Sequence, residues 1–311
     1  MKVKEYSFKS ATGVCTIHGC EYTPDKDAVK AVIVLHHGMA EHQERYHDFI
    51  AYLTSNGIAV FMHDMANHGK SNQNFEETGY FGEKDGYKFL VKDLKTTFDR
   101  AKNAYPDKKI IAMGHSMGSF ITRCFTAWYS DAGFSAAIYM GTGGSNPAAG
   151  AGDILSSGLA KLQGAKHKSK FVDKLTFGSY NKKFEGRTPF DWLTRDSEIV
   201  DKYIADDYCG FLFSVQGMND LVKLNINANS SEWYSKVPKD IPILVISGDM
   251  DPVGNFGEGL KEVHSKLLES GHSKAVLKLY EGGRHEILNE INKAEVYSDI
   301  LSFVENNVLG D

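Results

Sequence analysis

The stretch that decides the fold is Lys109-Ile-Ile-Ala-Met-Gly114-His-Ser-Met-Gly118, in which an apolar run passes directly into a Gly-x-Ser-x-Gly sequence. The residues that follow, 119–129, have a helical pattern, so the serine falls between a strand and a helix. Such a serine sits on a tight turn, and the glycines two positions to either side let the backbone turn without a clash. The stretch therefore predicts a nucleophile elbow with Ser116 as the nucleophile, and its neighbour His115 as a packing residue.

Short apolar runs recur along the chain and alternate with helical patterns. We expect strands at 3–8, 14–21, 31–36, 58–63, 109–113, 136–140, 243–247 and 275–280. Helical patterns fall at about 45–56, 84–104, 117–130, 256–270 and 286–308. The alternation predicts an α/β fold with a mostly parallel central sheet flanked by helices. The first two runs are close in sequence, so we expect an antiparallel hairpin at one edge.

The alternation breaks between about Gly141 and Pro238. This stretch has no clear strand pattern, is rich in aromatic residues and opens on a loose glycine-rich segment. We interpret it as a mainly helical insertion between two strands. The predicted organisation is a core made of residues 1–140 and 238–311, with a helical cap at 141–237.

Composition sets limits on the class of protein. The chain has 311 residues, of which 42% are hydrophobic and 24% charged, as in ordinary globular proteins. A net charge of −5 argues against binding of nucleic acid. The first ten residues contain no apolar run, and no run is long enough to span a bilayer, so we expect a cytoplasmic protein with no transmembrane segment. The four cysteines show no redox or metal spacing and are expected to be reduced thiols: Cys15, Cys20, Cys124 and Cys209.

Partners for the serine follow two late strands. A serine hydroxyl needs an imidazole to take its proton and a carboxylate to fix the tautomer of that imidazole. Asp251 comes just after the run 243–247, and His285 just after the run 275–280, where open α/β sheets place their sites. The order serine, acid, histidine predicts a catalytic triad of Ser116, Asp251 and His285. Asp249 is the competing acid, but Pro252 holds Asp251 extended and favours it.

Acyl transfer also needs two hydrogen-bond donors for the developing oxyanion. The amide of Met117, which follows the nucleophile, is the first candidate. The second is the amide of Met39, in the loop His36-His-Gly-Met-Ala-Glu-His42, where Gly38 permits a tight backbone. The histidines and the glutamate of this loop could be interpreted as a metal site. Ligands so crowded on one turn rarely converge, so we expect no metal, and nothing in the sequence calls for a cofactor.

The sequence with these motifs resembles the monoacylglycerol lipase and lysophospholipase group of the α/β-hydrolase superfamily, which is also named the serine aminopeptidase group. The pieces that carry the resemblance run in order over nearly the whole chain: 37–42 with Arg45 and Tyr46, 64–71, 114–118, 248–253 and 283–286. The resemblance implies the α/β-hydrolase fold, the triad Ser116, Asp251 and His285, and oxyanion amides from Met39 and Met117. It also implies that the cap shapes an acyl pocket.

Further residues match the family's oxyanion-loop segment, whose usual role is to hold the loop by polar contacts: His37, Gly38, Glu41, His42 and Arg45. One residue departs from the pattern. Asn67 stands where the family usually has glycine, and asparagine tolerates the left-handed conformation that such a turn needs.

The leading hypothesis is a serine hydrolase that cleaves carboxylic esters of acyl chains through an acyl-enzyme, with monoacylglycerol or lysophospholipid as substrate. A carboxylesterase acting on short-chain or aryl esters is the alternative. A peptidase or amidase is less favoured, because neither Gly-Gly-Ser-Trp-Gly nor His-Gly-Gly-Pro-Gly is present. A dehalogenase or epoxide hydrolase would need aspartate at Ser116. A non-catalytic ligand binder is less favoured, because such proteins commonly lose a triad residue and all three are present.

The segment 161–187 is strongly basic. It contains eight Lys and Arg residues against only Asp173 and Glu185. It is interpreted either as a solvated loop or as a basic lip that makes transient contact with an anionic lipid surface.

Overall fold

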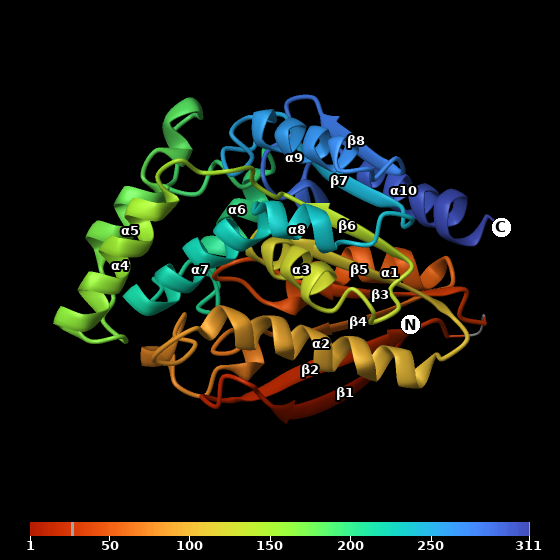
Figure 1. Cartoon of the computed structure of the whole chain (residues 1–311), viewed down its shortest axis with the longest axis horizontal. Coiled ribbons are helices and arrows are strands. Elements are labelled where there is room, and N and C mark those ends of the chain that lie inside the picture. Colours follow the sequence, from red (N-terminus) through yellow and green to blue (C-terminus); the bar gives the residue numbers. More distant parts are fainter. Residues whose placement is uncertain (26–27, 311) are drawn as a thin grey trace.

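The computed structural model describes residues 1–25 and 28–310, and an eight-stranded sheet runs through it in the order β1-β2-β4-β3-β5-β6-β7-β8 (Figure 1). The strands are β1 Lys2–Lys9, β2 Thr16–Thr23, β3 Ala31–His36, β4 Ile58–His63, β5 Lys109–His115, β6 Ala136–Met140, β7 Ile243–Gly248 and β8 Ala275–Tyr280. β1 and β2 form an antiparallel hairpin, β2 joins β4 antiparallel, and the remaining pairs are parallel. All predicted strands and the edge hairpin are confirmed.

Helices alternate with the parallel strands as predicted. The α-helices are α1 His47–Ser55, α2 Gly86–Ala104, α3 Met117–Trp128, α4 Ala149–Gln163, α5 Lys170–Phe177, α6 Ser197–Ala205, α7 Val215–Ala228, α8 Ser231–Lys236, α9 Glu258–Glu269 and α10 Lys293–Val304. The last helix begins later than the expected position 286. The reason is that Glu290 accepts hydrogen bonds from the amides of Arg284 and Arg195 instead of lying on a helix face.

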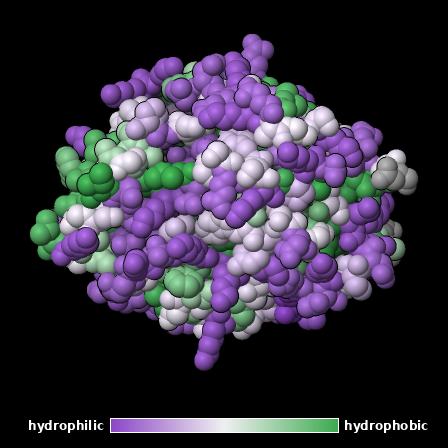
Figure 2. Space-filling model, viewed as in Figure 1, coloured by the Kyte–Doolittle hydropathy of each residue, from purple (hydrophilic) through white to green (hydrophobic). Residues whose placement is uncertain are grey.

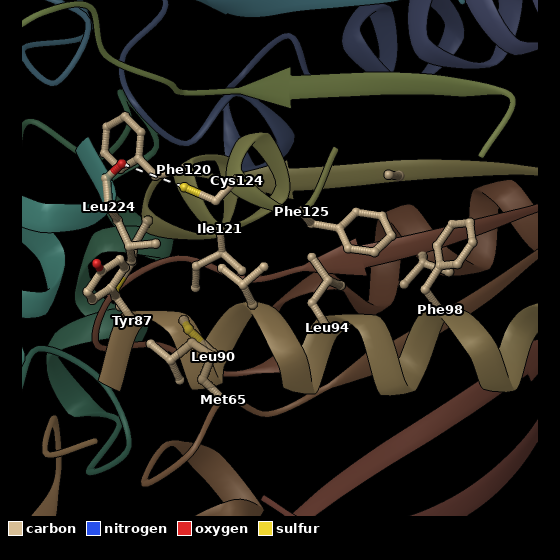
Figure 3. Packing of buried hydrophobic residues seen from close by; sticks show 14 of the residues in the cluster. Met65, Tyr87, Leu90, Leu94, Phe98, Phe120, Ile121, Cys124, Phe125 and Leu224 are labelled. Atoms are coloured by element: carbon tan, nitrogen blue, oxygen red, sulfur yellow. Dashed lines mark hydrogen bonds between the residues drawn. The ribbon is translucent and has the colours of Figure 1, made fainter. Parts of the chain in front are cut away.

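Two hydrophobic layers enclose the sheet. On one face, α1 and α10 pack Phe49, Ile50 and Ile300 against the strands. On the other face lie α2 and α3, and Figure 3 shows Leu94 of α2 pointing toward Phe125 of α3. The strands β3 and β4 are buried along their whole length, which explains their continuous apolar runs.

The segment between β6 and β7 carries α4 to α8. Figure 1 shows α4 and α5 standing away from the sheet at one end of the molecule, while α7 and α8 lie beside α3. The buried guanidinium of Arg123 on α3 ties both ends of this segment down, donating to the carbonyls of Gly143 at 3.0 Å and Ala228 at 2.5 Å. We propose that 141–237 acts as a cap whose second half is anchored to the core. No helix among the described residues combines the length and apolar character needed to cross a membrane.

A buried carboxylate joins this segment to the core and makes stability depend on pH. Asp220 of α7 is fully buried and accepts a hydrogen bond from the Tyr87 amide of α2 at 3.1 Å. Its second oxygen has no partner in the described residues, and burial raises the pKa of Asp220 to about 7. The folded state therefore binds this proton more tightly than the unfolded chain, so the free energy of unfolding falls as the pH rises from about 4 to about 7.

Replacing Asp220 with asparagine is expected to stabilise the protein at alkaline pH, because the amide never ionises. We expect a gain of about 1–3 kcal/mol in the free energy of unfolding at pH 8, shrinking toward pH 4. Urea titrations of Asp220→Asn and the parent at both pH values would measure it. The exposed Asp131→Asn is the control and should show no such pH-dependent gain. An equal gain at pH 4 and pH 8 would contradict the titration of Asp220.

Candidate active site

The structure places Ser116 on a strained turn between β5 and α3. Its φ of 54° and ψ of −123° lie outside the regions that ordinary residues occupy. The turn is possible because Gly114 and Gly118 let the chain close on itself. A Cβ on Gly118 would come within 2.3 Å of the carbonyl oxygen of His37. The elbow predicted from the sequence therefore has the expected geometry, with the serine side chain at the wall of a cavity.

His285 and Asp251 lie together on the loops after β8 and β7. His285 Nδ1 donates a hydrogen bond to Asp251 Oδ1 at 2.9 Å. The carboxylate is fully buried and also accepts from Ser247 Oγ at 2.7 Å and from the Val253 amide at 2.9 Å. Burial alone would raise the pKa of Asp251, but the charge and hydrogen bond of His285 outweigh it and lower the pKa. An ionised Asp251 keeps the proton on Nδ1 and leaves Nε2 free to act as a base.

The competing aspartate has another partner. Asp249 Oδ1 accepts a hydrogen bond from the Gly282 amide at 2.8 Å, which joins the loops after β7 and β8. The structure thus pairs His285 with Asp251, while Asp249 stabilises the turn beside it.

The loop after β3 lies against the elbow. A Cβ on Gly38 would stand 2.6 Å from Glu41 Oε1 and 3.1 Å from the Cβ of Ser116, so a side chain there would displace Glu41 and crowd the serine. The amides of Met39 and Met117 donate to no other group in the described residues, and both methionines line the cavity with Ser116. Because neither amide has an acceptor, the pair is available to a ligand oxygen in the cavity.

Two neutral histidines, His37 within the oxyanion loop (residues 37–42) and His68 outside it, hold this loop in place by hydrogen bonds. His37 Nε2 accepts from the Met65 amide at 2.8 Å, and its Nδ1 donates to the Gly38 carbonyl at 2.8 Å. His68 Nε2 accepts from the Ala40 amide at 3.3 Å. Burial lowers the pKa of His68 to about 4 and that of His37 well below its usual value, so each ring stays neutral and can accept. The sequence predicted no role for His68, although His68 lies in the segment 64–71 that carries part of the family resemblance.

The turn that positions His68 contains the departure from the family pattern. Asn67 adopts a φ of 55° and donates from Nδ2 to the Tyr80 carbonyl at 2.8 Å. Asparagine therefore accommodates the left-handed turn as predicted, and its side chain secures a second loop.

A buried charge network connects the oxyanion loop to the loop after β8, residues 281–286, which carries His285 and is called the histidine loop below. Glu41 accepts from the Gly38 amide at 2.6 Å, from Tyr46 Oη at 2.7 Å and from Arg45 at 2.5 Å. Arg45 also binds Glu286 through two hydrogen bonds of 2.7 and 2.6 Å. Because Glu286 directly follows His285, one guanidinium joins both sides of the site. The sequence pointed to Glu41 and Arg45, and Glu286 lies in the family segment 283–286, but no sequence pattern predicted its pairing with Arg45.

His115 belongs to the same network. Its Nδ1 lies 3.0 Å from Tyr46 Oη, and its Nε2 lies 3.3 Å from the backbone carbonyl of His285. Burial lowers the pKa of His115, but the hydrogen bond and charge of Glu41 outweigh this effect and raise it. His115 therefore holds the histidine loop through the His285 carbonyl, in keeping with the predicted packing role.

Replacing Glu41 with glutamine tests this network. The amide cannot balance the charge of Arg45, and its NH2 group would face a donor. Breaking a buried pair of this kind costs about 3–5 kcal/mol of stability. We expect a lower melting temperature and a kcat reduced more than KM is changed, since the loop that carries the Met39 amide loses its anchor. Glu232→Gln, an exposed residue in an ion pair with Lys236, is the control and should change neither. Parent-like stability and kcat would refute the anchoring role.

The cavity above Ser116 has a volume of about 930 Å³. Its floor contains Ser116, His285 and the oxyanion loop, and its walls come largely from the cap. The apolar wall residues include Phe120, Leu155, Leu175, Phe177, Trp192 and Phe211. A mostly apolar cavity of this size over a few polar groups is typical of a site for a ligand with an apolar part.

The cap also contacts the loops that carry Ala40, His42 and His285, and no local sequence pattern predicts these contacts. The ring of Trp192 lies 5.1 Å from that of His285, and the His285 amide donates to the Trp192 carbonyl at 3.4 Å. Tyr203 Oη donates to the Ala40 carbonyl at 3.0 Å, and His42 contacts Asp206 at 2.9 Å. His42 thus points at the cap rather than into the cavity.

The sheet order, the strained serine turn and the Asp–His pair beyond β7 and β8 define an α/β-hydrolase. A family model described as "Serine aminopeptidase, S33" matches residues 27–292, and the chain belongs to this family.

Comparisons with known proteins agree with this assignment. The chain is 28% identical over 304 residues to a monoacylglycerol lipase from Mycolicibacterium smegmatis, covering 98% of both chains. It is 25% identical to the monoglyceride lipase of Mus musculus, covering 93% of this chain and 87% of the relative. A solved thermostable carboxyl esterase from Bacillus coagulans, in complex with glycerol, has a TM-score of 0.92 and 31% identity, with 99% of both chains covered. The predicted family, fold and class of enzyme, a carboxylic ester hydrolase, are confirmed.

Proposed function

We propose that the chain hydrolyses carboxylic esters with an apolar acyl chain, such as monoacylglycerols, through an acyl-enzyme on Ser116. The observation that carries this proposal is a single cavity, largely apolar, that contains Ser116, His285 and the amides of Met39 and Met117 at its floor. Two relatives, named monoacylglycerol lipase and monoglyceride lipase, support monoacylglycerols as the substrate class.

The residues have distinct roles in this proposal. His285 Nε2 takes the proton of Ser116 as the serine oxygen attacks the ester carbonyl. The amides of Met39 and Met117 stabilise the oxyanion, and His285 then donates its proton to the departing alcohol. Water, activated by the same imidazole, releases the acyl group from the serine. Asp251 stays ionised throughout and stabilises the imidazolium.

The length of the acyl chain separates the two leading functions. We expect the hydrolysis of nitrophenyl esters from two to sixteen carbons to be fastest at eight carbons or more, because the cap lines the cavity with apolar side chains. Phe177→Ser, at the cap wall, should lower kcat/KM for long esters more than for the acetate. A maximum at two to four carbons would support the carboxylesterase alternative instead.

The outer face of the cap has the composition of a lipid-contacting surface. Figure 2 shows hydrophobic residues gathered at the end of the molecule where α4 and α5 lie. Exposed residues there include Ile154, Leu162 and Phe171, which are 66–84% exposed. Lys161, Lys170 and Lys174 make no ion pair in the described part of the chain and stand beside them. We propose transient contact of this face with anionic lipid.

Vesicle binding tests this surface independently of the chemistry. The inactive Ser116→Ala protein should sediment with vesicles that contain anionic lipid, and less so at high salt. Leu162→Ser with Phe171→Ser should reduce the bound fraction several-fold, while Val276→Ser, an exposed apolar residue on the distant strand β8, should not. Equal binding of all three proteins would remove the proposed contact.

A further inference from the structure

A second group of side chains outside the catalytic centre brings metal-binding atoms together. His42, Asp206 and Cys209 each offer one such atom, and these atoms lie within 4.8 Å of one another. His42 Nε2 and Asp206 Oδ2 are already 2.9 Å apart. An imidazole nitrogen, a carboxylate oxygen and a thiolate sulfur are the three ligand types that zinc takes in proteins.

The thiol packs in a small buried cluster with Leu193 and Tyr203 and has no polar partner there. Cys209 is only 9% exposed, and its sulfur makes no hydrogen bond within the described residues. A bound zinc ion would displace the thiol proton, which would pass to the buffer as the metal–sulfur bond forms.

The surrounding charges accept a cation. The positive charge of Arg45 acts on both Asp206 and Cys209. Its charge is already matched by Glu41 and Glu286, to which it is hydrogen-bonded. The third ligand, Asp206, is partly exposed at 32% of its side chain, so an ion can enter from solvent.

We propose that His42, Asp206 and Cys209 form a zinc site that links the oxyanion loop to the cap. Ligands 2.0–2.3 Å from a tetrahedral zinc ion stand about 3.3–3.7 Å apart. On binding, His42 Nε2 and Asp206 Oδ2 would therefore separate from 2.9 Å, and the sulfur would close to this spacing from at most 4.8 Å. Two hydrogen bonds hold the segments together, since the Ala40 carbonyl accepts from the Gly210 amide at 2.9 Å and from Tyr203 Oη at 3.0 Å. The residues come from segments more than 160 positions apart, so a bound ion would fasten the cap beside the loop that carries Met39.

A thermal melt with added zinc chloride tests the site without relying on catalysis. Zinc that binds only the folded protein raises its melting temperature. We expect a rise of about 3 °C or more at saturating zinc for the parent, and less than a third of that rise for Cys209→Ser. The matched control is Cys20→Ser, because Cys20 lies in a second group with Glu5 and His18 that has similar spacing. Cys20→Ser should keep the full response.

Equilibrium dialysis provides a second readout. The parent should bind one zinc ion per chain, and Cys209→Ser should lose this binding. Asp206→Asn should weaken zinc binding at least tenfold, which keeps the test decisive if Cys209→Ser folds poorly. No rise in melting temperature for the parent would overturn the proposal. So would an equal rise in Cys209→Ser, or a rise lost only in Cys20→Ser. All measurements use the Ser116→Ala background as well as the parent, so a failure of the proposed esterase chemistry stays separate from a failure of this site.

Discussion

Replacing Ser116 with alanine is expected to lower kcat for ester hydrolysis by about 10⁴–10⁶-fold while leaving the fold intact. The reaction loses its nucleophile, so no acyl-enzyme forms. The backbone is unaffected because its φ of 54° depends on the surrounding glycines, and alanine has the same Cβ as serine at that position. Steady-state kinetics on a nitrophenyl ester, with a thermal melt of the same sample, would measure both effects.

The rest of the proposed triad gives the matching set of outcomes. His285→Ala should lose nearly as much activity as Ser116→Ala, and the double variant little more, because the two residues act as a unit. Asp251→Asn should lose about 10⁴-fold, because an amide favours the wrong tautomer of His285. Asp249→Asn is the control, since Asp249 binds the Gly282 amide and not His285. A larger loss in Asp249→Asn than in Asp251→Asn would reverse the assignment of the acid.

Replacing Gly118 with valine is expected to destabilise the core strongly. A Cβ there would stand 2.3 Å from the carbonyl oxygen of His37 and 2.4 Å from that of His36. Both are backbone atoms that cannot rotate away, so either α3 or the oxyanion loop must shift. We expect a loss of about 4 kcal/mol or more in the free energy of unfolding, or failure to fold. A urea titration would measure this loss.

The matched control is Gly158→Val. Gly158 also lies in a helix, α4, but a Cβ there has no neighbour within 4 Å. We expect a change of less than about 1 kcal/mol, since helix propensity differs little between the two residues. If Gly118→Val melted at the parent temperature, the close approach of α3 to the oxyanion loop would not be what makes glycine necessary.

The sequence by itself determined the sheet and the positions along the chain of the proposed triad. Continuous apolar runs predicted the strands, because a strand buried on both faces needs apolar side chains at every position. The Gly-x-Ser-x-Gly stretch predicted the turn at Ser116, because only glycine accepts backbone so close. Asp251 and His285 were identifiable because each follows a strand run, and parallel strands bring their carboxyl ends to one edge of the sheet. All of these signals are local in the chain.

The tertiary structure decided how the site is supported. Glu286 binds Arg45 across 241 residues, Trp192 packs on His285, and Asp206 meets His42 across 164 residues. None of these pairs has a spacing or motif that a single sequence can display, since a long-range contact depends on how the loops fold over the sheet. The same holds for the late start of α10. Glu290 lies before this helix and accepts a hydrogen bond from the Arg284 amide of the histidine loop. Local patterns fix which residues can react, and the packing of distant segments fixes what holds them in place.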